Sequence, residues 1–287
     1  MSSAVVTAIA AQKGGTGKTA LAGSLAPQWA YAGFRTLIVD LDQQANLTYA
    51  FAVDPNRLDA TVVDVLAPRD PVAASNALVR DVHGVPGLDL LPCDERAEGL
   101  DTQLRSETMG VFKFKHALKP LLAGYDRVFL DCPPNVGELT VSALLAADEI
   151  ICPVNMGDTN ALRGLKRLTR TVAKLSDHAD VRFKGLVKVK CDEARLSYRL
   201  NSDALRALAD SLGLPLARAE LRARAAWEKA ITQDLPLVLL HESDRGTLEA
   251  QADVRRLALE LWPEVDFPFA SEIRALRSSP PSERRAA

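Results

Sequence analysis

Lys13-Gly14-Gly15-Thr16-Gly17-Lys18-Thr19 is the stretch of sequence that decides the fold. The apolar residues 4–11 before it predict a buried strand, and residues 20–26 after it predict a helix. A glycine-rich turn between a strand and a helix is the setting of a phosphate-binding loop. The usual motif has a glycine where this chain has Gln12, but the later Gly-x-Gly-Lys-Thr spacing is intact. The stretch therefore predicts an α/β fold that binds a nucleotide.

The residue types of this loop suit a phosphate group. Glycines allow successive backbone N–H groups to turn towards an anion, and the start of the following helix adds a partial positive charge. We expect Lys18 to reach the β- and γ-phosphates and the Thr19 hydroxyl to ligate Mg²⁺. The alternative, a turn that binds no ligand, is disfavoured by the flanking strand and helix. The nucleotide-binding residues expected in this region are Lys13, Gly14, Gly15, Thr16, Gly17, Lys18, Thr19 and Ala20.

Lys13, at the front edge of the loop, resembles the signature lysine of the deviant Walker A ATPases, the ParA/MinD group. The resemblance implies ATP and Mg²⁺ as cofactors and a P-loop NTPase fold. It also implies that Lys13 reaches across a dimer interface to the phosphates bound by the other subunit. The alternative is a solvated lysine beside the loop. Ala20 stands where many relatives carry a second hydroxyl residue, so we expect one contact to the α-phosphate to be missing.

A second motif extends the resemblance. Residues 36–42 form an apolar strand that ends in two aspartates, and Asp42-Gln43-Gln44-Ala45-Asn46 resembles the family's D-P-Q-G-N. Gln43 and Ala45 depart from that pattern. The resemblance implies that Asp42 orients and activates the attacking water and shares the catalytic role with Lys13 and Lys18. Asp40 is a candidate for the metal site or, alternatively, a cap at the strand end.

A third motif completes the set. Residues 125–134 form an apolar strand that ends in Asp131-Cys132-Pro133-Pro134, which resembles the family's Walker B motif. The resemblance implies that Asp131 joins the Mg²⁺ shell through a water molecule. The two prolines remove backbone donors and stiffen the turn that follows. The expected metal-site residues are therefore Thr19, Asp40 and Asp131.

Length and composition favour one large domain. The chain has 287 residues, 47% of them hydrophobic, and a net charge of −2. We expect a single P-loop ATPase domain over residues 1–277 and a flexible tail over residues 278–287. No apolar window reaches transmembrane length, and the N-terminus lacks the pattern of an export signal. The four cysteines form no C-x-x-C pair, which disfavours a zinc or redox site and agrees with a reducing cytoplasm.

Strand-like and helix-like runs alternate along the chain. This order predicts a mostly parallel, twisted sheet with helices on both faces. Besides the strands of the three motifs, strands are expected near residues 88–91, 149–153 and 186–189. Helices are expected over residues 137–147, 161–175, 202–212 and 247–262, the last as a closing core helix.

Charge is distributed unevenly. Residues 1–150 hold 12 Lys or Arg and 18 Asp or Glu, whereas residues 163–229 hold 16 basic and 8 acidic residues. Such a bias is typical of a nucleic-acid-binding surface, although a solvated helix surface gives the same pattern. Residues 221–227 resemble the family stretch I-R-x-R-x-A-F, which implies DNA contacts here and an approach of Leu221 to the adenine. The expected DNA-binding residues are Arg222, Arg224, Arg195 and Arg199; positions 222 and 224 do not share a helix face, so one of them can serve another role.

The resemblance as a whole implies a small ParA-type partition ATPase without an N-terminal helix-turn-helix domain. It implies an ATP-dependent homodimer that binds double-stranded DNA without sequence preference, a ParB-like partner that stimulates slow hydrolysis, and a cytoplasmic, nucleoid-associated location. One alternative is a MinD-like regulator of division that acts on a membrane or a protein lattice. Membrane binding is not expected, because the C-terminus lacks a basic amphipathic helix. An ATP-dependent ligase or synthetase, for which no acceptor motif is visible, and a DNA-binding switch with slow hydrolysis are also compatible with the motifs.

Overall fold

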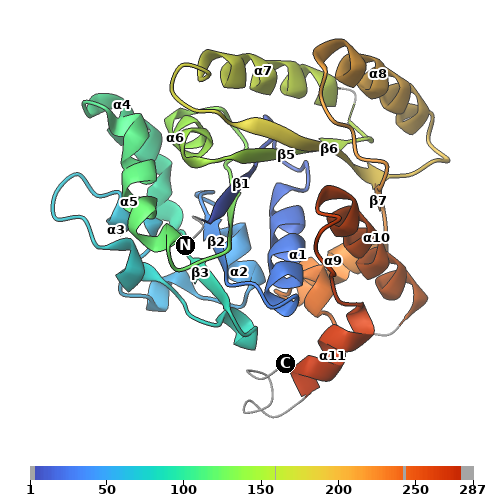
Figure 1. Cartoon of the computed structure of the whole chain (residues 1–287), viewed down its shortest axis with the longest axis horizontal. Helices are drawn as coiled ribbons and strands as arrows, with labels where there is room; N and C mark the ends of the chain where they lie inside the picture. The colour runs from blue at the N-terminus through green and yellow to red at the C-terminus, as the bar shows by residue number, and fades with distance from the viewer. Residues whose placement is uncertain (1–3, 159, 242–243, 279–287) are drawn as a thin grey trace.

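A single parallel sheet organises the chain. The computed structural model describes residues 4–158, 160–241 and 244–278. Its seven strands lie in the order β3-β2-β4-β1-β5-β6-β7, and every neighbouring pair is parallel (Figure 1). The strands are β1 Val5–Ile9, β2 Thr36–Asp40, β3 Leu88–Leu91, β4 Arg127–Asp131, β5 Glu149–Asn155, β6 Arg182–Cys191 and β7 Leu221–Arg222. The expected α/β sheet is confirmed.

Helices cover both faces of this sheet (Figure 1). The α-helices are α1 Lys18–Tyr31, α2 Asn46–Ala50, α3 Val62–Val65, α4 Leu100–Ser106, α5 Lys113–Leu122, α6 Glu138–Ala146, α7 Ala161–Lys174, α8 Leu196–Leu212, α9 Ala225–Thr232, α10 Arg245–Leu261 and α11 Ala270–Ser278. Short 3₁₀ turns lie at Pro55–Arg57, Ala74–Ala77, Val82–Gly84, Glu95–Gly99, Gly110–Phe112 and Leu237–Leu239. Of the predicted tail, residues 279–287 lie outside the described part of the chain.

Two apolar clusters, one on each face, hold the layers together. Strands β1, β2 and β4 are almost fully buried, as expected for parallel strands covered on both sides. One cluster packs α4 to α8 against the sheet, and the other packs α1, α2 and α9 to α11 against the opposite face. Helix α10 is the closing core helix predicted from its amphipathic pattern, and it buries Val254, Leu257 and Leu261.

Several elements differ from the sequence expectation. Helix α8 begins at Leu196 rather than at residue 202, because its first two turns carry exposed apolar and charged side chains that hide the helical period. Strand β7 has only two residues, too few for any pattern to reveal it. The expected helices also do not include α2 to α5, α9 and α11. Within the described residues, no helix is long and apolar enough to cross a membrane.

Helix α11 lies where the sequence suggested no amphipathic helix. Its Ile273 is fully buried, and the Arg277 guanidinium donates a hydrogen bond to the Leu239 carbonyl oxygen at 2.6 Å. The helix therefore packs on the body of the protein with both an apolar and a polar anchor.

An aromatic cluster joins α1 to the C-terminal part of the chain. The Trp29 ring meets the Trp262 ring edge-to-face at 5.3 Å between centroids and the Phe267 ring at 5.5 Å. The buried Arg127 guanidinium lies 4.2 Å from the centre of the Trp29 ring, and it also pairs with Glu149 at 3.1 Å. This cluster fixes the phosphate-loop helix against α10.

Replacing Trp262 with alanine should lower the free energy of unfolding by ~3–5 kcal/mol, because the change leaves a large cavity among these rings. Denaturant titration followed by circular dichroism measures this loss. Ile231→Ala is the control, since Ile231 is 72% exposed, and should change stability by less than ~0.5 kcal/mol. Equal effects of the two changes would contradict the packing role.

Candidate functional site

The phosphate loop joins β1 to α1 and has the backbone shape that an anion requires. Gly15 has φ of 70° and Gly17, the N-terminal cap of α1, has φ of 80°. This left-handed conformation is open to glycine and unfavourable for other residues. The first N–H groups of a helix have no partner within it, so those at the start of α1 can bind an anion.

The two lysines of the loop occupy different environments. Lys18 is buried, and its Nζ donates a hydrogen bond to the Lys13 carbonyl oxygen at 3.2 Å. The Thr16 hydroxyl donates to the same oxygen at 3.4 Å, and the Asn155 amide donates to the Gly15 carbonyl oxygen at 3.4 Å. The loop is therefore closed on itself, with the Lys18 ammonium beneath it.

Lys13 is held within its own chain. Its side chain is 48% exposed, and its Nζ lies 2.6 Å from the Asp158 carboxylate. The hydrogen bond from Lys13 lowers the pKa of Asp158 below the ordinary value. Asp158 follows the C-terminal end of β5, and the amide of Asn201 on α8 donates to its carbonyl oxygen at 3.3 Å. The sequence interpretation missed Asp158, although its place just after a strand is the signal that identified the other aspartates.

Strand register places two aspartates side by side below the loop. Asp40 at the end of β2 is the direct partner of Asp131 at the end of β4, and both are fully buried. The Asp40 carboxylate accepts hydrogen bonds from the Asp42 amide at 3.0 Å and from the Thr48 amide and hydroxyl at 2.9 and 2.8 Å. Burial raises the pKa of Asp40 to about 6 despite these bonds. These bonds favour the strand-end cap, the alternative role for this residue.

Asp131 is the unsatisfied member of the pair. Within the described residues, neither of its carboxylate oxygens accepts a hydrogen bond of good geometry. Burial, followed by the neighbouring Asp40, raises the pKa of Asp131 well above the ordinary value, while the Thr19 hydroxyl and the Lys18 charge act in the opposite direction. A buried carboxylate without partners is costly unless a cation balances it.

This orphaned carboxylate fits a Mg²⁺ ion. In the described part of the chain, no group of three or more His, Cys, Asp or Glu residues could hold a metal alone. Mg²⁺ does not need such a group, since it is commonly bound by one or two protein oxygens, water and substrate phosphates. Thr19 and Asp131 are the residues that would hold the ion in this way.

Asp42 lies in a tight turn after β2. It is buried, its carboxylate accepts a hydrogen bond from the Gln44 amide at 3.1 Å, and its carbonyl oxygen accepts one from the Ala45 amide at 2.8 Å. Ala45 has φ of 50°, a conformation that explains why the family motif has glycine at this position. The turn is kept here with alanine, and Asp42 remains at the strand end where open α/β sheets bind ligands.

The residues expected to contact DNA and adenine are dispersed. Leu221 is buried in β7, whereas Arg222 is exposed, 3.9 Å from Glu193. The Arg224 guanidinium is mostly buried against Glu249 and Asp253, which gives it the separate role that the i, i+2 spacing left open. Arg195 pairs with Asp192 at 2.9 Å, and Arg199 is exposed on α8. A hollow of about 290 Å³ separates residues 191–194 from residues 222–224.

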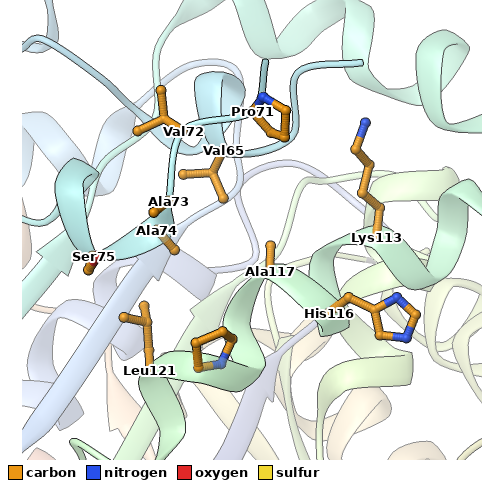
Figure 2. A pocket seen from close by; sticks show the side chains of 11 residues that line it. Val65, Pro71, Val72, Ala73, Ala74, Ser75, Lys113, His116, Ala117 and Leu121 are labelled. Atoms are coloured by element: carbon orange, nitrogen blue, oxygen red, sulfur yellow. The ribbon is translucent and has the colours of Figure 1, made fainter. Parts of the chain in front are cut away.

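A larger hollow lies elsewhere. It measures about 470 Å³ and is lined mainly by apolar residues of α5 and of residues 71–75, with His116 and Lys113 at its rim (Figure 2). The Lys113 ammonium is engaged by Glu107 at 2.8 Å. No residue of the phosphate loop lines either of these two hollows.

Comparisons with known proteins agree with this geometry. The model of a family described as an AAA domain matches residues 4–184. Cell division protein PomZ of Myxococcus xanthus is 30% identical over 240 residues, which cover 84% of this chain and 73% of PomZ. Chromosome partitioning protein ParA of Caulobacter vibrioides is 36% identical over 172 residues, which cover 59% of this chain and 62% of that protein. The chain belongs to the ParA-type ATPases of this family.

The similarity to one solved structure extends over nearly the whole of this chain. Cobyrinic acid a,c-diamide synthase from Mycobacterium smegmatis, with bound ADP and magnesium, aligns with a TM-score of 0.72 and 28% identity. The alignment covers 93% of this chain and 98% of that one. The P-loop NTPase fold expected from the sequence is confirmed.

Asp131→Asn should separate the stability of the empty protein from cation binding. At pH 7.5 the change should raise the free energy of unfolding of the nucleotide-free protein by ~1–3 kcal/mol, because a neutral amide costs less to bury than an orphaned carboxylate. ATP with Mg²⁺ should stabilise the wild-type protein against heat more than ATP alone does, and the variant should lose this difference. Thermal unfolding with ATP alone and with ATP plus Mg²⁺ measures both effects.

The difference in free energy of unfolding between Asp131→Asn and the wild type should depend on pH in a defined direction. The folded chain keeps the Asp131 proton to a higher pH than the unfolded chain does, so the wild type loses stability as pH rises above about 4. The gain from Asp131→Asn should therefore grow from pH 4 to pH 7.5. Asp177→Asn on the exposed surface is the matched control, and an equal response of the two variants would contradict the assignment.

Proposed function

We propose that this protein is a ParA-like ATPase of DNA segregation, which binds ATP and Mg²⁺ and dimerises around them. The observation that carries the proposal is Lys13, a half-exposed lysine of the phosphate loop that makes its ion pair with Asp158 instead of closing its own site. The dimer binds double-stranded DNA without sequence preference, and hydrolysis releases it. Joining two weak cationic surfaces in one dimer strengthens DNA binding through effective concentration.

Each residue of the site has a defined task in this proposal. The glycines and the start of α1 bind the phosphates, Lys18 neutralises their charge, and Thr19 and Asp131 hold Mg²⁺, which shields the phosphate oxygens when bound. Asp42 holds a water molecule in line with the γ-phosphate and accepts its proton. Lys13 from the second subunit completes the charge around the phosphates.

The names of the relatives support a positioning role. One acts in chromosome partitioning and another in cell division. We place the protein in the cytoplasm on the nucleoid, with a ParB-like DNA-binding protein as the partner that stimulates slow hydrolysis. The synthase similarity raises a second candidate, an ATP-dependent synthetase.

A further candidate is a division regulator that works on a membrane or a protein lattice, and the PomZ similarity favours it over the synthetase. Binding to DNA and to liposomes of anionic lipid, each with ATP, separates the two positioning roles. DNA-stimulated ATP turnover without any small acceptor would exclude the synthetase.

Lys13→Ala should preserve ATP binding within about threefold, because Lys18 and the glycines remain. The same change should abolish the ATP-dependent dimer, since the cross-subunit charge is lost. Sedimentation velocity with a non-hydrolysable ATP analogue measures the dimer. A fully formed dimer would refute the role of Lys13.

Asp158→Asn is the opposing comparison. It removes the carboxylate that holds Lys13 in its own chain, so it should favour the dimer at lower protein concentration than the wild type needs. A decrease in dimerisation would show that the pair supports assembly instead of competing with it.

Asp42→Ala should reduce ATP hydrolysis by at least ~100-fold, the usual contribution of a positioned general base. ATP binding should persist, so the ATP-bound dimer should accumulate on DNA. Phosphate release and DNA co-sedimentation measure the two effects, with Asp177→Ala as the surface control. Hydrolysis at the wild-type rate would rule out Asp42 as the water-orienting residue.

A further inference from the structure

Helix α7 has a row of cationic side chains without anionic partners. Its exposed face carries five lysines and arginines, and none of them forms an ion pair with a carboxylate in the described part of the chain. The helix contains no acidic residue at all. The five residues, which we call the α7 row, are Arg163, Lys166, Arg167, Arg170 and Lys174.

The α7 row is straight and faces solvent. Leu165 and Leu168 on the opposite side of the helix are buried in the core. The row follows i, i+3 and i, i+4 steps, so its charges lie on one face over about 16 Å at 1.5 Å per residue. In Figure 1, α7 lies on the outside of the sheet above β5 and β6, next to α8.

This arrangement is unfavourable for the isolated helix. Like charges at i, i+3 and i, i+4 repel each other, and cations near the first turn oppose the helix dipole. Several arginines elsewhere in this half of the chain do have carboxylate partners, such as Arg195 with Asp192 and Arg224 with Glu249. The repulsion between the cations of α7 is not compensated within the described part of the protein, and a bound anion would relieve it.

The chemistry of the face distinguishes a nucleic acid from a protein partner. Protein contacts usually contain apolar anchors, and the described residues of α7 expose no large apolar side chain. Helix α8 differs, because Leu196 and Leu200 are exposed there beside Arg199. Mixed apolar and arginine surfaces are typical of protein interfaces, whereas a purely cationic row matches a phosphate backbone.

We propose that the phosphate backbone of double-stranded DNA binds along the α7 row, a site distinct from Arg222, Arg224, Arg195 and Arg199. The inference rests on the proposed function and specifies its DNA site. Helix α7 packs close to the phosphate loop, since a side chain on Gly164 would lie 3.4 Å from the Gln12 carbonyl oxygen. The DNA site is thereby joined rigidly to the nucleotide site.

Three variants of equal charge change test the site. The α7 variant combines Arg167→Gln, Arg170→Gln and Lys174→Gln, which avoids the turn beside the phosphate loop. The second combines Arg195→Gln, Arg199→Gln and Arg222→Gln. The control combines Arg69→Gln, Lys115→Gln and Lys119→Gln, three exposed cations on another part of the surface. Affinity for a random-sequence DNA duplex is measured with a non-hydrolysable ATP analogue at several salt concentrations.

The α7 variant should bind DNA at least tenfold more weakly, and the slope of log affinity against log salt should fall by roughly 0.9 for each phosphate that the variant no longer neutralises. The control should stay within twofold of the wild type. If the wild type binds DNA and the α7 variant binds equally well, the site is wrong and the proposed function stands. If the wild type fails to bind DNA with the ATP analogue, both are wrong.

Two further measurements keep the test decisive. ATP binding by the α7 variant reports on its fold. If the variant no longer binds ATP, the double change Arg170→Gln with Lys174→Gln replaces the triple change. A DNA affinity of this double variant within twofold of the wild type overturns the proposed site. An acidic peptide, polyglutamate, serves as the competing ligand. If polyglutamate binds to the wild type through the α7 row but does not affect DNA binding, the row would be assigned to an acidic protein instead.

Discussion

The direct pairing of Asp40 with Asp131 in the parallel sheet is the constraint on which the site depends. Parallel register brings the ends of β2 and β4 to the same edge, so two carboxylates are buried next to each other beneath the phosphate loop. The two differ in how they are compensated. Backbone and hydroxyl donors satisfy Asp40, while Asp131 has only the nearby Lys18 and Thr19 to oppose its charge. The charge of Asp131 therefore suits a bound cation, and the phosphates that accompany the cation would complete the balance.

The loop near these aspartates is held by its own backbone conformation and hydrogen bonds. Gly15 and Gly17 provide the left-handed turns, and Lys18 and Thr16 both bond to the Lys13 carbonyl oxygen. Binding a phosphate to a loop of this kind requires little reorganisation. Lys13 differs, because its side chain is directed to Asp158 and must leave that pair before it can act elsewhere. In the dimer proposed above, assembly would therefore be a step separate from nucleotide binding, although both involve this one short segment.

The sequence predicted the parts of this protein that have short-range patterns. Apolar runs that end in aspartate located β2 and β4, and the glycine spacing located the phosphate loop, all within a few residues. What it could not predict depends on distant contacts. The partner of Lys13 is 145 residues away, the ion pairs of Arg224 come from α10, and β7 exists only because β6 lies beside it. The charge of the α7 row was visible as a composition bias, but its alignment on one face became clear only with the helix in place.

The ring cluster around Trp29 also bears on how the chain is made. Trp29, Phe129 and Trp262 come from three segments that emerge from the ribosome far apart in time. Until the last of them appears, α1 has no α10 to cover it, and its apolar side remains open to water. Contacts of such long range slow folding, and partly covered domains attract chaperones or aggregate. Synthesis of the C-terminal helices is therefore the step that allows the nucleotide-binding half to finish folding.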